Sequence, residues 1–399
     1  MTTHAEFFPM TKLQVPNPHF KAINPPHRLL LGPGPQDAHP RVHAALSLPQ
    51  VGHMDPGFLE IMEEAKALLK YAWQTENKFT IPISGTGSAA WEAAIANLTE
   101  PGDVHLIFAN GFFGQRALDM HSRYGAVIRK CVKADGEVFT LAEIEAGIIE
   151  HKPDLIWLCH AETSTGTLQP MEGVGDLCRK YDCLVMLDTV TSICGSPIYI
   201  DAWKIDAAYG GSQKCMGCPP GVSCLTLNDR ALAKLDARKN PVANWYLDMT
   251  MIRKYIFEPE PGVPRVYHHT APISMIYAIR EALQIVSEEG LEQSWERHKK
   301  TAERLYKELE LMGLEFIVKD KSIRTPCLTT VKLPADVSAA VVLKYMRDEL
   351  FIEVGGGLGY LSGKIVRIGL MGYNSRADNV ILVIQALKEA IAFARSNAL

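Results

Sequence analysis

The amino-acid sequence predicts an α/β protein in which a mostly parallel sheet is flanked by helices and is followed by a smaller C-terminal α/β domain. The first observation is a series of short, continuously apolar runs: DVHLIFA (103–109), AVIRKCV (126–132), LIWLCH (155–160), CLVMLD (183–188), DAAYGG (206–211) and GVSCLTL (221–227). Such runs suit strands that are covered on both faces. The second observation is that helical stretches, such as 141–151, separate several of them. Alternating strands and helices are typical of parallel sheets.

The elements outside this region follow in chain order. Residues 1–27 are Pro-rich and weakly patterned, which indicates an arm. A helix is expected over 55–73, with Asp55 as N-cap and Pro56 as the first helical residue. Its apolar stripe consists of Phe58, Met62, Ala65, Leu69 and Ala72. Long helices are expected over 273–290 and 291–313, then strands over 327–333 and 364–370 that alternate with helices. We therefore expect an arm (1–27), a large domain (28–289) and a small domain (290–399).

Composition excludes several classes of protein. The 399 residues are 47% hydrophobic and 22% charged, enough for a large core, and the net charge of −4 gives no basic excess. Nucleic acid and anionic membranes are therefore not expected as partners. Nine cysteines, an odd number, indicate reduced thiols, and no run is apolar over the ~20 residues of a membrane helix. We expect a soluble intracellular protein, with the cytoplasm favoured and peroxisome or mitochondrion left open.

Polar residues at the carboxyl ends of the expected strands are the candidates for a functional site. The turn 84–88 (SGTGS) precedes a helix, and its small residues together with the helix dipole suit a phosphate, although a simple tight turn is the alternative. Asp188 ends an apolar strand and would need a cation or donors if buried, although it could be a helix cap. His160 ends another strand, but a lone histidine there is as well explained as a core residue.

Lys214 follows the apolar run 206–211 in the stretch YGGSQKCMGCPPG. A lysine amine in a site that excludes water has its pKa lowered from about 10.4, which makes it a nucleophile able to form a Schiff base. A solvated surface lysine is the alternative. Cys215 and Cys218 form a C-x-x-C motif, but no second pair or histidine cluster accompanies it, so no metal site is expected and the role of the two thiols stays open.

Together these residues match the chemistry of pyridoxal 5′-phosphate. Its aldehyde needs an amine such as that of Lys214, its pyridine nitrogen needs a carboxylate such as that of Asp188, and its phosphate needs a helix N-terminus such as that after residue 84. One cofactor accounts for three otherwise unrelated features.

The sequence also resembles a known family. The segments LLLGPGP, SGTGSAAWEAAIANL, HAETSTGTLQP, LDTVTSICG, GGSQK, CPPG, VYHHTAP, EEGLE and GGLGYLSGKIVRIGLMG are similar, in this order from about residue 28 to 395, to the class V aminotransferases of the alanine:glyoxylate and serine:pyruvate group. The resemblance implies pyridoxal-phosphate fold type I, with a seven-stranded sheet in the large domain and active sites at the interface of a homodimer.

The resemblance also assigns roles to residues. Lys214 would form the aldimine with the cofactor and would carry the proton between the substrate Cα and C4′ of the cofactor. Asp188 would pair with the pyridine nitrogen, and Arg367 would bind the substrate α-carboxylate. The remaining residues are assigned to the cofactor or the substrate. Those assigned to the cofactor are Thr86, Gly87, Ser88, Phe113, Thr163, Val190 and Gln213, with Tyr267 and Thr270 lent by the neighbouring subunit. Those assigned to the substrate are Gly34, Thr163 and Tyr360.

Two of these positions depart from better-known animal members of the family. Phe113 stands where those members have a tryptophan that stacks on the cofactor ring, and Ser88 stands where they have a histidine. A phenyl ring can still stack, with less area.

The implied reaction is a ping-pong transamination from alanine or serine to glyoxylate or pyruvate through the Lys214 aldimine. No second cation for a side-chain carboxylate is evident in the sequence, which favours a small neutral donor. Ureidoglycine or 3-hydroxykynurenine remain alternative donors. A cysteine desulfurase is less favoured, because the only late cysteine, Cys327, begins a strand-like run. A non-catalytic scaffold is less favoured because Lys214 and Arg367 lie within intact motifs.

Overall fold

The computed structural model describes residues 21–396, so most of the expected N-terminal arm lies outside the described residues. Its principal sheet has seven strands, as the resemblance implies, in the order β2-β10-β9-β8-β5-β3-β4. The strands are β2 (Phe79–Ser84), β10 (Val222–Leu227), β9 (Ala207–Gly211), β8 (Leu184–Asp188), β5 (Leu155–Cys159), β3 (Val104–Ala109) and β4 (Val127–Val132). The five strands from β9 to β4 are parallel, whereas β10 is antiparallel to β9 and β2. The sheet is therefore mostly parallel, as predicted.

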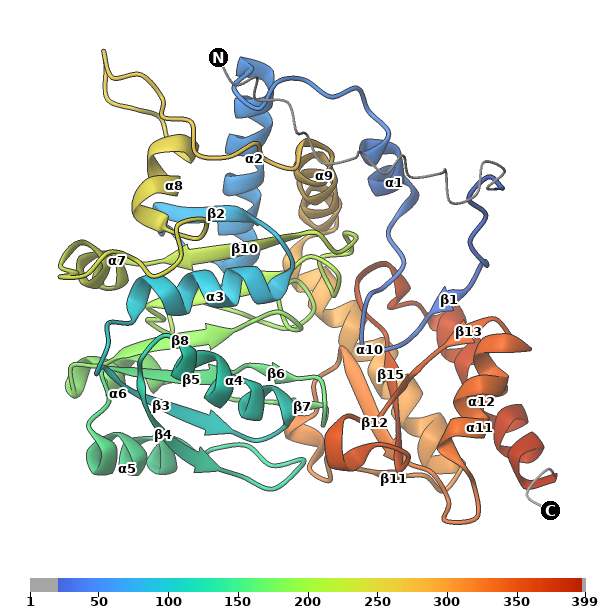
Figure 1. The fold of residues 1–399 in the computed structure, drawn as a ribbon. Helices are drawn as coiled ribbons and strands as arrows, with labels where there is room; N and C mark the ends of the chain where they lie inside the picture. Colours follow the sequence, from blue (N-terminus) through green and yellow to red (C-terminus); the bar gives the residue numbers. More distant parts are fainter. Residues whose placement is uncertain (1–20, 397–399) are drawn as a thin grey trace, which may run out of the picture.

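Helices flank this sheet (Figure 1). They are α1 (Pro40–Leu46), α2 (Pro56–Trp73), α3 (Gly87–Leu98), α4 (Phe112–Arg123), α5 (Leu141–His151), α6 (Val174–Lys180), α7 (Asp229–Asp236), α8 (Met249–Ile256) and α9 (Ile273–Glu289). The N-cap of α2 is Asp55, whose side chain accepts a hydrogen bond from Gly57 N, and the predicted apolar stripe is buried. A short hairpin, β6 (Ala161–Glu162) with β7 (Thr167–Leu168), follows β5.

One expectation about the strands is wrong. The run 126–132 was expected to be covered on both faces, but none of the residues of β4 is fully buried. The reason is that β4 is an edge strand, which pairs with β3 alone. Its sequence VIRKCV carries Arg129 and Lys130, and charged residues are common on exposed edges.

The C-terminal part forms a second, smaller sheet with its own helices, drawn orange to red in Figure 1. The antiparallel sheet has the order β11 (Glu315–Phe316), β12 (Leu328–Lys332), β15 (Ile365–Gly369) and β14 (Gly355–Gly356). Its helices are α10 (Leu291–Leu311), α11 (Ala339–Asp348) and α12 (Ala377–Ser396), with short 3-10 turns η1 (Lys321–Ile323), η2 (Gly359–Leu361) and η3 (Gly372–Asn374).

Two hydrophobic cores underlie the two sheets. Residues of α9 pack in the first core, whereas α10 contributes Trp295 to the first and Leu305 to the second. Strand β1 (Leu29–Leu30) pairs in parallel with β13 (Ile352–Glu353), and Leu31 lies in the second core. The first residues of the expected large domain (28–289) therefore pack with the C-terminal part. The expected domain boundary at residue 290 directly precedes α10, which contributes to both cores. Among the described residues, no helix is long and apolar enough to span a membrane.

Candidate active site

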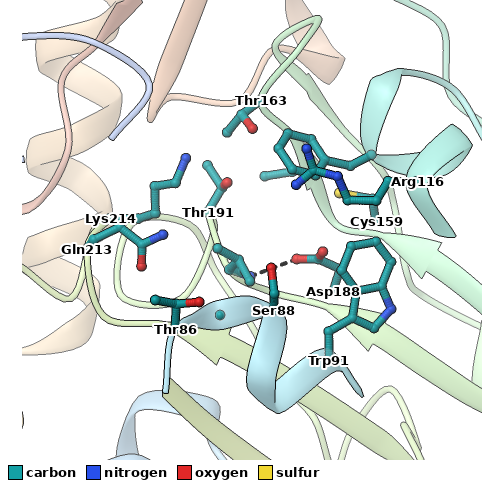
Figure 2. A pocket seen from close by; sticks show the side chains of 14 residues that line it. Thr86, Ser88, Trp91, Arg116, Cys159, Thr163, Asp188, Thr191, Gln213 and Lys214 are labelled. Atoms are coloured by element: carbon teal, nitrogen blue, oxygen red, sulfur yellow. Dashed lines mark hydrogen bonds between the residues drawn. The ribbon is translucent and has the colours of Figure 1, made fainter. Parts of the chain in front are cut away.

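A cavity lies where β8 and β9 end and α3 begins (Figure 2). Its walls come from α3, α4, β5, the segment after β6 and the loops after β8 and β9. The lining residues are Thr86, Gly87, Ser88, Trp91, Phe113, Arg116, Cys159, Ala161, Thr163, Asp188, Val190, Thr191, Gln213 and Lys214. The structure thus brings together three of the four strand-end and turn features that were predicted separately, namely the turn 84–88, Asp188 and Lys214, but not His160.

Lys214 extends into this cavity from the loop after β9 (Figure 2). Its side chain is buried, and its Nζ donates a hydrogen bond to the carbonyl of Pro33. Burial, and then the positive charge of Arg367, lower the pKa of Lys214 to about 8. An amine with that pKa is neutral in a substantial fraction of molecules near neutral pH, as a nucleophile or proton acceptor requires. The alternative of a solvated surface lysine does not hold.

Asp188 is the last residue of β8 and is also buried. Its Oδ1 accepts a hydrogen bond from Val190 N at 2.9 Å, and its Oδ2 accepts one from the Tyr209 hydroxyl at 2.8 Å. Burial raises the pKa of Asp188 to about 6, against the two hydrogen bonds, which lower it. No ion pair joins this carboxylate to a cation within the described residues, so a buried anionic acceptor faces the cavity.

The N-terminus of α3 forms the end of the cavity beside Gln213 (Figure 2). Thr86 is the N-cap and its side chain makes no capping hydrogen bond, so hydroxyl and backbone N–H groups are available to an anion. The backbone at Gly87 packs closely on Val190, since a Cβ there would lie 3.4 Å from Val190 Cγ2. The Oε1 of Gln213 is buried without a hydrogen-bond partner.

Arg367 lies on β15 of the small sheet and approaches the cavity through Thr163. Its Nη1 donates to the Thr163 carbonyl at 3.0 Å, and its Nε donates to the Gly356 carbonyl at 2.7 Å. Two of the five N–H donors of a guanidinium are used in this way. The others can bind a carboxylate, and burial lowers the pKa of Arg367 only to about 10, so it stays charged.

Gly34 lies against Lys214 in the loop after β1. It has φ of +104°, and a Cβ there would lie 2.8 Å from Lys214 Cδ and 2.9 Å from Cε. Only glycine therefore allows the lysine side chain to pass at this point.

Five of the predicted residues are not among those that line the cavity in the single chain. Gly34 and Arg367 contact the lining residues Lys214 and Thr163, whereas Tyr267, Thr270 and Tyr360 lie apart from the lining. Tyr267 and Thr270 are exposed, and their hydroxyl oxygens lie 3.4 Å apart. Tyr360 is also exposed and donates a hydrogen bond to Asp135, which joins η2 to the loop after β4.

Five lining residues were missed by the sequence reasoning: Trp91, Arg116, Cys159, Ala161 and Thr191. Helical spacing could have found two of them, since Trp91 lies three residues after Ser88 and Arg116 three after Phe113. The guanidinium of Arg116 lies 5.0 Å from the centre of the Phe113 ring, and no carboxylate pairs with it within the described residues. Arg116 is thus a second cation in the cavity that the sequence analysis did not single out.

Several other polar groups do not belong to the cavity. His160 is buried with its ring against Trp203, and burial lowers its pKa to about 3, as fits the alternative of a core histidine. Cys215 and Cys218 are both buried, and Cys327 is a buried thiol at the head of β12. Among residues 21–396 no group of three or more His, Cys, Asp or Glu side chains could hold a metal ion.

Comparison with known proteins identifies the class. A model of the family described as aminotransferase class-V matches residues 41–381, and the chain therefore belongs to the class-V aminotransferases. Members of this family depend on pyridoxal phosphate.

Individual relatives cover nearly the whole chain. Alanine–glyoxylate aminotransferase of Mus musculus is 44% identical over 390 residues, which are 97% of this chain and 94% of the relative. (S)-Ureidoglycine–glyoxylate transaminase of Bacillus subtilis is 36% identical and covers 92% of this chain and 91% of the relative. A crystal structure of alanine–glyoxylate aminotransferase from Nostoc sp. has a TM-score of 0.90 and 51% identity, over 93% of this chain and 97% of that one.

Proposed function

We propose that the chain transfers an amino group from a small neutral amino acid, alanine or serine, to glyoxylate, or to pyruvate, with pyridoxal 5′-phosphate as its cofactor. The observation that carries the proposal is the placement of the buried Lys214 amine and the buried Asp188 carboxylate in one cavity beside the N-terminus of α3. The names of the mouse and Nostoc relatives support the choice of substrates.

The residues present fit this cofactor. Asp188 is a buried carboxylate with no ion-pair partner among residues 21–396, and a protonated pyridine nitrogen would supply one. The uncapped start of α3 would hold the phosphate, together with the amide NH2 of Gln213, which can donate to it from the cavity lining. Phe113 and Val190 offer apolar contacts to a flat ring. When bound, the cofactor supplies an electron sink for the bond that breaks at the substrate Cα.

The chain's own residues would perform the remaining tasks. Arg367 would hold the substrate carboxylate, because two backbone carbonyls fix its guanidinium and leave donors free. The Lys214 amine, with its lowered pKa, would remove the proton from the substrate Cα and deliver it to C4′ of the cofactor. Thr163, whose carbonyl binds Arg367, would position its hydroxyl near the same carboxylate.

Arg116 bears on the choice of amino donor. A cation in the cavity could bind an acidic or ureido side chain, and the Bacillus relative is named for ureidoglycine, so that donor stays the second candidate. The ring contact of Arg116 with Phe113 gives it a role that needs no substrate carboxylate. We therefore retain the small neutral donor as first choice. Desulfuration is not proposed, because Cys327 is fully buried at the head of a strand.

We further propose that the active unit is a homodimer in which Tyr267 and Thr270 reach the phosphate of the neighbouring active site. Both residues are exposed, and neither lines the cavity of its own chain.

The proposal is tested by single half-reactions. Enzyme loaded with pyridoxal phosphate is mixed with alanine, serine, aspartate, ureidoglycine or 3-hydroxykynurenine, and loss of the yellow absorbance of the lysine-bound cofactor is followed. Alanine or serine should bleach the wild type fastest, and glyoxylate should restore the band. Lys214→Ala is the control and should show no catalytic bleaching.

The other outcomes are distinct. If ureidoglycine or 3-hydroxykynurenine alone bleaches the band, the reaction type stands and the proposed donor is wrong. If the wild type forms no yellow band with pyridoxal phosphate, the cofactor assignment fails.

A further inference from the structure

Behind Asp188 lies a chain of hydrogen bonds that the assigned site residues do not include. The Tyr209 hydroxyl donates to Asp188 Oδ2 at 2.8 Å, and the Trp157 indole N–H donates to the Tyr209 oxygen at 3.0 Å. Sheet register produces this arrangement, because Asp188 of β8 is the partner of Tyr209 on β9. In a parallel sheet, such neighbours project from the same face.

The direction of the hydrogen bonds is fixed by chemistry. An indole N–H can only donate, so the Tyr209 oxygen must accept from Trp157. The single proton of the tyrosine then has Asp188 as its acceptor. If Oδ2 of Asp188 carried a proton instead, the tyrosine proton would lose its buried acceptor, which is costly. The chain therefore favours the ionised carboxylate.

Packing keeps water away from this chain. All three side chains are buried, and Trp91 stacks on Trp157 at 5.4 Å and on Tyr209 at 5.5 Å, with interplanar angles of 10° and 15°. Trp157 and Tyr209 have no exposed surface, so solvent cannot replace the hydrogen bond between them if it is removed. The other titratable groups that act on this region are Cys159 from β5, Glu162 from β6 and Lys214 from the loop after β9.

From this geometry we infer that Trp157 and Tyr209 are positioning residues, which hold Asp188 as an ionised acceptor oriented towards the cofactor's ring nitrogen. This inference deepens the proposed function, and the second of its two tests, which uses the cofactor, rests on that function. Neither residue touches the substrate. Trp157 acts only through Tyr209, by fixing where the tyrosine proton points.

The first test uses the full chain freed of cofactor and measures unfolding free energy against pH. The folded-state pKa of Asp188, about 6, lies above that of an unfolded aspartate, about 3.9, so its ionisation lowers stability as pH rises between these values. Tyr209→Phe removes a donor and raises the folded-state pKa further. Its stability deficit should therefore grow from pH 4 to pH 7, whereas a packing defect would be independent of pH.

The second test measures the dissociation constant of pyridoxal phosphate for the same variants. Tyr209→Phe should weaken binding by about tenfold at pH 5 and by about twofold at pH 7, because a rise of about one unit in the pKa of Asp188, from about 6, lowers its ionised fraction by these factors. Trp157→Phe should act in the same direction but less, because Tyr209 keeps its hydroxyl and loses only its fixed orientation. The matched controls are Tyr306→Phe, which removes a hydroxyl bonded to the Thr325 carbonyl, and Trp295→Phe, whose indole N–H has no partner.

The outcomes separate the inference from the proposed function. A pH-dependent deficit of unfolding free energy in Tyr209→Phe and Trp157→Phe, absent in both controls, supports the inference. A deficit that does not vary with pH, or equal losses in the controls, overturns it. An effect of Tyr209→Phe without one of Trp157→Phe overturns the role of the tryptophan. If the wild type fails to bind pyridoxal phosphate, the proposed function fails. The pH dependence of the unfolding free energy still decides whether Trp157 and Tyr209 act on Asp188.

Discussion

At the scale of single residues, the charge of Arg367 acts on Lys214 as well as on the proposed substrate. Arg367 is the second-largest cause of the lowered pKa of Lys214, after burial. In Arg367→Gln the pKa of Lys214 should rise above about 8 without reaching that of a free lysine, because burial persists. The measurement is the pH dependence of the rate at which cofactor-free protein combines with pyridoxal phosphate. An unchanged midpoint would show that the two cations do not interact.

At position 367, a lysine should not be able to replace the arginine. Arg367→Lys keeps a positive charge but loses the planar pair of donors that a carboxylate accepts. We expect kcat/KM for alanine to fall by about 100-fold, the loss of ~3 kcal/mol for a charge-assisted hydrogen bond. Steady-state kinetics with alanine and glyoxylate measure this. A loss below fivefold would argue that another group binds the carboxylate.

Gly34 allows a prediction about a close contact with Lys214. Gly34→Ala would place a Cβ 2.8 Å from Lys214 Cδ at a φ of +104°. Gly102→Ala is a matched control, since Gly102 has a φ of +96° with nothing within 4 Å of its Cβ position. Both variants should lose about 1–2 kcal/mol of stability from the left-handed backbone. Only Gly34→Ala should also slow the alanine half-reaction, by an expected tenfold or more, because the lysine is displaced.

At the scale of elements, substitution of the N-cap residue of α2 should change the stability of the protein but not its half-reaction rate. Asp55 caps this helix through Gly57 N at 2.8 Å and is exposed, far along the chain from the cavity-lining residues. Asp55→Ala should lower the unfolding free energy by about 1 kcal/mol. Asp55→Asn, which can still accept the hydrogen bond, should retain most of it. A change in half-reaction rate at saturating cofactor would contradict this separation.

The elements also explain how far sequence reasoning could go. Lys214 and Asp188 were predicted because each follows an apolar strand, and strand ends meet at one edge of a parallel sheet. Arg116 was not predicted, because the helical spacing that places it on the same face of α4 as Phe113 was not used. The contact between α4 and the hairpin after β5 is likewise non-local, since Phe113 N at the start of α4 donates a hydrogen bond to the buried Glu162. The pairing of β1 with β13 joins residues more than 300 apart, which no local pattern records.

At the scale of the whole molecule, the proposed contribution of Tyr267 to the neighbouring subunit's active site can be tested with variants of the two subunits. Tyr267→Ala should weaken the binding of pyridoxal phosphate, because an exposed hydroxyl of one chain would be lost from the other chain's site. Lys214→Ala should be inactive for a different reason, the loss of the amine. Each variant alone should therefore have little activity.

Mixed dimers of these two variants should regain activity. The site that retains Lys214 would receive Tyr267 from the Lys214→Ala chain, so one site of each mixed dimer is complete, while the other carries both defects. With random exchange half of the dimers are mixed, and the mixture should reach about a quarter of wild-type activity. The measurement is the alanine half-reaction after the two variants are unfolded and refolded together, with separately refolded samples mixed afterwards as control. Recovery in neither sample would mean that Tyr267 serves its own chain, and the proposed dimeric site would then be wrong.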